Sequence, residues 1–237
     1  KMYMTMIEGA VGTPRLVWNL FQNTAILLCI SLAVTPAFKM KFWNIGAEGQ
    51  FYMGAFASSA VAFTFADLPP YVLLPMMFIV GFLFGGFWAF IPAVLKAKFL
   101  TSETLVTLML NYVAAKWVSH LQYGPWKDPK ASGFPKIATF SDNAILPSVF
   151  GIHIGWIITL IIAIVLYILF KKSKLGYEID VLGESEATAK YSGMNVKKIM
   201  FTAIMISGGI CGIAGMMQAS AIEHSLSDKL SGGLGFT

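Results

Sequence analysis

Hydrophobic residues along this chain gather in long runs that are separated by short polar stretches. Six of these runs approach or exceed the length that a helix needs to cross a hydrocarbon layer of roughly 30 Å, because each helical residue adds about 1.5 Å. The pattern predicts an all-α, polytopic transmembrane bundle that forms a single domain over residues 1–237. The expected spanning segments are residues 16–38, 51–66, 71–95, 103–121, 154–170 and 199–222.

Two of the six segments differ from simple lipid-exposed helices. Residues 51–66 are short and rich in glycine, alanine and serine, a composition that suits close helix packing. The segment 103–121 carries Asn111, Lys116 and His120, so it must face a partner helix or a wet cavity.

Composition makes the bilayer the solvent for most of the chain. Charged residues make up 12% of the sequence and hydrophobic residues 57%, whereas a soluble domain carries roughly 25% charged residues. The net charge of +5 comes from lysines in short patches between apolar runs, which argues against a nucleic-acid partner. Cys29 and Cys211 each lie inside an apolar run, so neither a disulfide framework nor a cysteine metal site is indicated.

Lysine and arginine in short loops predict the orientation, because they favour the cytoplasmic side. The stretches 39–50, 96–104 and 171–198 together hold ten lysines and fall on one side of the membrane, which we assign to the cytoplasm. The opposite side holds six basic residues: Lys1, Arg15, Lys127, Lys130, Lys136 and Lys229. The loop 122–153 is then external, and its length suits either contact with an external partner or an ordered cap.

Residues 44–50 read Asn-Ile-Gly-Ala-Glu-Gly-Gln and lead directly into an apolar run. Such a stretch suits a broken or re-entrant helix, since glycines permit sharp turns and polar side chains satisfy the freed backbone groups. An ordinary cytoplasmic turn, with Glu48 near a helix N-terminus, explains the spacing equally well.

The segment 176–198 is too polar to span the membrane. Residues 183–193 are expected to form about two turns of helix between Gly183 and Gly193, with acids at the start and Lys190 late. A short helix on the cytoplasmic face is suited to dock in a groove of another protein, and a solvated loop is the alternative.

No constellation supports catalysis or a metal site, since the histidines are scattered and no P-loop is present. For transport, polar groups at membrane depth are the useful candidates, because they are costly unless they face a pathway or one another. Aromatic residues would add surface for stacking, although interhelical hydrogen bonding explains any single polar member as well. The candidate pathway residues are Asn19, Gln22, Asn44, Glu48, Gln50, Trp88, Thr107, Asn111 and Tyr112.

Several stretches together resemble the permease subunits of ABC importers for nucleosides and simple sugars, a broad family with ribose and branched-chain amino acid permeases. They are residues 44–50, Thr-Ser-Glu-Thr-Leu-Val at 101–106, Tyr-Gly-Pro-Trp at 123–126, the loop 176–198 and Gly-Leu-Gly-Phe at 233–236. Their order and spacing point to the nucleoside branch. Permeases of this kind are longer, so the chain is expected to be truncated at both ends.

The resemblance implies a multi-pass protein of a bacterial inner or plasma membrane that has no cofactor and is not itself an enzyme. Its implied partners are a separate ATP-binding subunit, a second permease subunit, an extracellular substrate-binding protein and the lipid bilayer. The helix 183–193 would be the coupling helix that contacts the ATPase. The residues implied in this contact are Gly183, Glu184, Glu186, Ala187, Ala189, Tyr191 and Gly193.

Two other classes of function stay open from the residues alone. A secondary transporter would need an acid embedded in the membrane for ion coupling, and Glu48 is the candidate. A membrane-bound enzyme would need an acid–base pair, for which the sequence offers no candidate.

Overall fold

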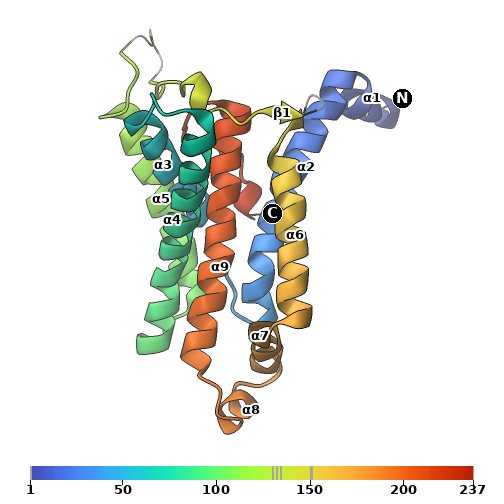
Figure 1. The fold of residues 1–237 in the computed structure, drawn as a ribbon, viewed down its shortest axis with the longest axis vertical. Helices are drawn as coiled ribbons and strands as arrows, with labels where there is room; N and C mark the ends of the chain where they lie inside the picture. The colour runs from blue at the N-terminus through green and yellow to red at the C-terminus, as the bar shows by residue number, and fades with distance from the viewer. Residues whose placement is uncertain (1, 130, 132, 134, 150–151, 237) are drawn as a thin grey trace.

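The computed structural model describes residues 2–129, 131, 133, 135–149 and 152–236 as a helical bundle (Figure 1). Lys1, Lys130 and Thr237 lie outside the described residues, as do small parts of the loop 122–153. The main helices are α1 (Met2–Val11), α2 (Pro14–Lys39), α3 (Ala47–Thr64), α4 (Pro70–Phe99), α5 (Glu103–Tyr123), α6 (Gly155–Lys172), α7 (Lys174–Glu184), α8 (Glu186–Tyr191) and α9 (Val196–Met217). Short elements are η1 (Asp142–Ala144), β1 (Ser148–Val149), β2 (Ile152–His153), η2 (Gln218–Glu223) and η3 (Leu234–Phe236), with β1 and β2 antiparallel.

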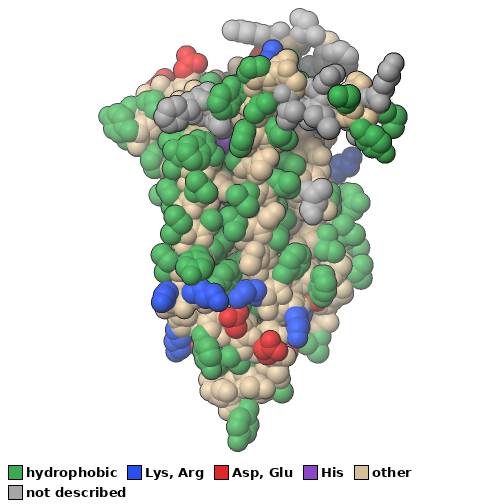
Figure 2. Space-filling view, turned by 90° about the vertical axis from the view of Figure 1, so that its right-hand side faces the viewer, with side chains coloured by type: hydrophobic (Ala, Val, Ile, Leu, Met, Phe, Trp, Pro, Cys, Tyr) green, Lys and Arg blue, Asp and Glu red, His purple; other side chains and the backbone are tan. Residues whose placement is uncertain are grey.

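Each of the six expected segments is a helix, and four of the described helices are long and apolar enough to cross a membrane. These four are α2, α4, α6 and α9 extended through η2. Helices α3 and α5 fall short of that standard, α3 because of its small and polar residues and α5 because of residues such as Asn111 and Lys116. The expected all-α membrane bundle is confirmed. Figure 2 shows hydrophobic side chains over the middle of one face and a band of lysine and arginine toward its lower end.

Helix α9 is the centre of the bundle and packs against α2, α3 and α4. Its contact with α3 and α4 is made through glycine: a Cβ at Gly212 would overlap the backbone carbonyl of Gly81, and one at Gly54 would overlap Gly212 itself. Small residues of this kind let membrane helices approach at backbone distance and gain van der Waals contact. The small-residue composition of 51–66 therefore serves helix packing, as the sequence predicts, and most of α3 is buried.

The two long polar segments lie at opposite ends of the bundle (Figure 1). At the lower end, α7 and α8 follow α6, and Lys39 at the end of α2 pairs with Asp180 of α7. Lys96 of α4 pairs with Glu103 of α5 at 2.6 Å, which joins those helices across the loop between them. At the upper end, η1 contacts α4, and Trp126 stacks on Phe56 of α3.

The expected single helix over 183–193 is wrong in its bounds, because the chain forms two helices there. Gly183 and Glu184 complete α7, and Ser185 adopts an extended conformation between the helices. The Ser185 hydroxyl accepts a hydrogen bond from the Thr188 backbone N–H, which caps α8. Gly193 follows α8 with a φ of +75°, a conformation that glycine adopts at little cost.

The glycine contact of α9 yields a first prediction. Gly212→Ala should lower the thermal stability of the purified protein, because the new methyl group meets backbone that cannot move, and overpacking of this kind costs about 1–3 kcal/mol. Gly209→Ala is the matched control on the same helix, since the three atoms nearest its Cβ belong to the Phe82 side chain, which can shift more readily than backbone. Equal melting temperatures for the two variants in detergent would contradict the packing argument.

Candidate functional site

A group of polar side chains is buried where α3 begins, in the interior of the bundle. We call Asn44, Glu48, Gln50, Thr107, Asn111, Ser207 and Ser231 the polar cluster. Its members come from the segment before α3, from α3 itself, from α5, from α9 and from the segment after η2. Each is at most 5% exposed.

The segment 40–46 between α2 and α3 is not helical, and Asn44 organises it. The Asn44 carboxamide oxygen accepts hydrogen bonds from the Gly46 backbone N–H at 3.0 Å and from the Gln50 amide at 3.0 Å. Its amide nitrogen lies 3.4 Å from the Ser207 hydroxyl of α9. The turn is polar and partly buried, since Asn44 is buried whereas Lys41 and Trp43 are exposed, and α3 begins after it at Ala47 with Glu48 in its first turn. These features fit both the broken-helix interpretation and the ordinary turn before a helix.

Asn111 attaches α5 to the same turn. Its oxygen accepts a hydrogen bond from the Gly49 backbone N–H at 2.8 Å, and its amide donates to the Ile45 carbonyl at 2.8 Å. The Gly49 N–H belongs to the first turn of α3, where N–H groups have no partner inside the helix, and Ile45 lies in the segment just before α3. Asn111 therefore faces a partner helix, one of the two environments that the sequence allowed for α5.

Glu48 joins the start of α3 to the segment that follows α9. Its carboxylate accepts hydrogen bonds from the Ser231 hydroxyl and from the Gly235 backbone N–H, the latter at 2.8 Å. Tyr52, one turn further along α3, donates to the Asp228 carbonyl at 2.7 Å. The position of Glu48 in the first turn of α3 also suits the helix dipole.

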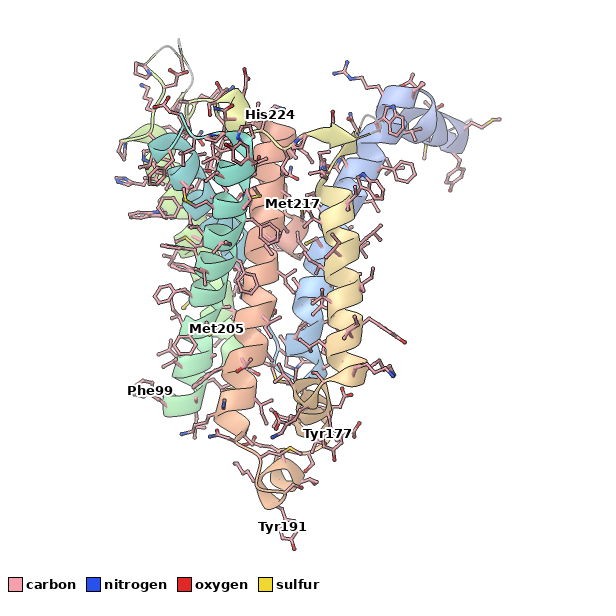
Figure 3. All side chains as sticks on the ribbon, in the orientation of Figure 1. Phe99, Tyr177, Tyr191, Met205, Met217 and His224 are labelled. Atoms are coloured by element: carbon pink, nitrogen blue, oxygen red, sulfur yellow. The ribbon has the colours of Figure 1, made fainter. Side chains whose placement is uncertain are left out.

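The segment after α9 reaches Glu48 from the upper end of the bundle, because the chain turns sharply where α9 and η2 end. After the π-helical η2, His224 adopts a left-handed conformation with φ of 52°, and the chain folds back into the bundle. Figure 1 shows the C-terminus at mid-height between α9 and α6, whereas His224 lies at the upper end (Figure 3). Sequence reasoning did not find Ser207, Ser231 or Tyr52.

The remaining candidate pathway residues lie apart from the polar cluster or only beside it. Trp88 of α4 packs near Gly49, and its indole nitrogen is buried with no hydrogen-bond partner within the described residues. Tyr112 is exposed on the outer side of α5, and Asn19 is exposed near the start of α2. Gln22 is half-buried.

Gln22 lies beside His153 of β2 at the upper end of the bundle. The His153 Nδ1 accepts a hydrogen bond from the Gly155 N–H at 3.1 Å, which places the ring at the start of α6. Burial lowers the pKa of the His153 imidazole, and the Gln22 backbone raises it by a smaller amount. The neutral ring is therefore the stable form in the folded protein.

The residues implied in ATPase contact divide into an exposed and a buried set. Tyr191 is 94% exposed and projects from the lower tip of the molecule (Figure 3). Ala189 is fully buried, and Gly183 packs its backbone against the Lys39 carbonyl of α2. The exposed members are Glu184, Glu186, Ala187, Tyr191 and Gly193.

The long apolar helices, the basic band at one end and the buried polar cluster define a multi-pass membrane protein. Residues 16–237 match the family model described as the branched-chain amino acid transport system / permease component, and the chain belongs to this family. Family membership confirms that it is a transport permease of the type that the sequence resembles.

Permeases whose names give a transported solute are similar to this chain over most of its length. The guanosine ABC transporter permease protein NupP of Bacillus subtilis is 31% identical over 243 residues, which cover 99% of this chain and 68% of the relative. The glucose ABC transporter permease protein TsgB13 of Haloferax volcanii is 31% identical over a match that covers 89% of this chain and 58% of the relative. The nucleoside ABC transporter permease protein NupB of Lactococcus lactis is 27% identical over a match that covers 99% of this chain and 67% of the relative. The chain thus spans about two thirds of the length of these relatives, and no solved structure matches it.

The Asn111 contacts yield a second prediction. Asn111→Ala should destabilise the protein by roughly 2 kcal/mol, because it leaves the buried Gly49 N–H of α3 and the half-buried Ile45 carbonyl without this partner. Val113→Ala, two residues away on the exposed side of α5, should change stability by less than about 0.5 kcal/mol. Thermal unfolding in detergent measures both, and an Asn111→Ala melting temperature equal to the control would show that the turn does not depend on this side chain.

Proposed function

We propose that this chain forms the translocation pathway of an ABC importer for nucleosides or related simple sugars. The observation that carries the proposal is the similarity of almost the whole chain to permeases named for guanosine, for nucleosides and for glucose. The sequence has no P-loop of its own, so ATP would be hydrolysed by a separate subunit. A second permease subunit and an extracellular substrate-binding protein would complete the importer.

The proposed orientation places α7 and α8 in the cytoplasm and residues 122–153 outside. The lysine distribution supports it, and so does the position of these segments at opposite ends of the bundle.

Helix α8 is the proposed contact with the ATP-binding subunit. It carries an exposed aromatic residue, Tyr191, and an exposed small residue, Ala187, which would allow close approach. Glu184 and Glu186 would meet basic groups on the partner, although Glu186 also pairs with Lys190 at 2.6 Å. Because Ala189 and Gly183 are buried, their role would be to attach α8 and α7 to the bundle.

A secondary transporter is the weaker alternative. Its candidate ion-coupling acid, Glu48, is already hydrogen-bonded by Ser231 and Gly235. The family of the chain also favours an ATP-driven importer.

Uptake measurements test the proposed function directly. The full-length permease, assembled with its ATP-binding and substrate-binding partners in proteoliposomes, should take up radiolabelled guanosine or ribose only when ATP is supplied. Uptake driven by an ion gradient without ATP would favour the secondary transporter. Absence of uptake for nucleosides, ribose and glucose alike would overturn the proposed substrate class.

The docking role of α8 gives a separate prediction. Tyr191→Ala should weaken association with the ATP-binding subunit by about 2 kcal/mol, or roughly 30-fold, because exposed aromatic residues often carry interface energy. Substrate-stimulated ATP hydrolysis should fall, while membrane insertion stays normal because the side chain contacts little of its own chain. Tyr167→Ala, which removes an exposed tyrosine from α6, is the control. Unchanged ATPase stimulation in the Tyr191 variant at matched expression would count against α8 as the docking element.

A further inference from the structure

Helix α5 has two faces of opposite character. Its inner face packs on α3 and includes Thr107 and Asn111 of the polar cluster. Its opposite face is exposed, and the residues on it recur every three or four positions, so they form one line along the helix. This outer stripe consists of Leu105, Met109, Tyr112, Lys116, His120 and Tyr123.

The outer stripe differs from the exposed faces of α4 and α6. Exposed residues in the middle of α4 and α6, such as Ile79, Leu83 and Ile164, are hydrophobic, as expected for contact with lipid. The stripe instead carries a lysine and a histidine, which are costly on a lipid-facing helix. The same residues help to explain why α5 falls short of the apolar character of the other long helices.

Depth along α5 strengthens the contrast. Lys116 lies seven residues before the end of the helix at Tyr123, or about 10 Å, and Tyr112 lies about 16 Å from that end. A lysine about 10 Å from the helix end, as Lys116 is, can extend its ammonium group toward the membrane surface. The Tyr112 hydroxyl has a shorter reach, and it would lie among lipid tails if the stripe faced lipid.

We propose that the outer stripe of α5 lines the aqueous path of the transported solute, and that Tyr112 and Lys116 contact it. This inference rests on the proposed function and adds the face and the residues that recognise the solute. The matching chemistry is an uncharged ring compound rich in acceptor oxygens, such as a nucleoside. The Tyr112 ring offers a stacking surface, and the Lys116 ammonium donates hydrogen bonds and repels cations.

Trp117 flanks the stripe and adds a fixed aromatic surface. It is 44% exposed, and its ring contacts Phe56 of α3 edge-on at 5.9 Å and lies 6.1 Å from the His120 ring. The polar part of the stripe occupies the half of α5 nearer residues 122–153, whereas Leu105 and Met109 occupy the other half. The proposed path is therefore polar at the proposed external end and apolar toward the cytoplasm.

Cysteine accessibility tests the stripe in the assembled transporter. Tyr112→Cys and Lys116→Cys are introduced after Cys29 and Cys211 are changed to alanine, which removes the two buried native thiols. A membrane-impermeant methanethiosulfonate applied from outside should modify both variants. Ile164→Cys is the matched control, since Ile164 lies about 14 Å into α6 and its exposure of 59% is close to the 63% of Tyr112.

The expected result is modification of the Tyr112 position about tenfold faster than of the Ile164 position, because a thiol in lipid does not ionise. Guanosine should slow the reaction at the Tyr112 position. Equal, slow modification at the two positions would place the stripe against lipid and overturn the inference. Disulfide cross-linking of Tyr112→Cys between two permease subunits, without modification by the reagent, would identify a dry protein interface and overturn it as well.

Failure of the stripe and failure of the proposed function give different results. If the wild-type complex takes up none of the solutes with ATP but the Tyr112 position still reacts quickly, the path is aqueous and the substrate class is wrong. If uptake of guanosine is normal and the Tyr112 position is unreactive, the function holds and the path lies elsewhere. Thr188→Cys on α8, which should react only from the cytoplasmic side, fixes the orientation in the same preparation.

Discussion

The close approach of α9 to α3 and α4 is the contact on which the rest of the structure depends. In a bilayer, helices gain little from hydrophobic burial against one another, so van der Waals contact and interhelical hydrogen bonds hold the bundle together. Gly212 brings the α9 backbone against Gly81 and Gly54, and this places Ser207 next to Asn44. The same position of α9 directs the chain after η2 back toward Glu48, so Ser207 and Ser231 reach the polar cluster because the glycine contact holds α9 in place.

The sequence predicted a helix well where the length and composition of that one segment are sufficient to identify it. The runs that became α2, α4, α6 and α9 are apolar along their length, and length with composition is enough to identify such a helix. The split at Ser185 was missed because the serine sits in a polar segment where the helical pattern continues on both sides. The Ser185 hydroxyl accepts a hydrogen bond from the Thr188 N–H and so caps α8, and this bond competes with the continuation of one longer helix.

The candidate site was predictable only in part, because its contacts join distant parts of the chain. Polar residues at membrane depth marked Asn44, Gln50, Thr107 and Asn111, and the structure brings them together at the start of α3. Nothing local to Ser231 shows that it meets Glu48, which lies 183 positions earlier. Nor could composition separate Asn111 from Tyr112, since neighbours on a helix point to different sides, one toward α3 and the other away from the bundle.

This separation decides which polar groups remain available to a solute. A buried group whose hydrogen bonds are already made, such as Asn111, can bind a solute only if a contact that holds the turn before α3 is broken. Among the described residues, Tyr112 and Lys116 make no such hydrogen bonds, and both lie on an exposed face. In a protein whose solvent is lipid, stability therefore uses the inward polar residues, and the proposed transport chemistry rests on polar residues that point outward from the bundle.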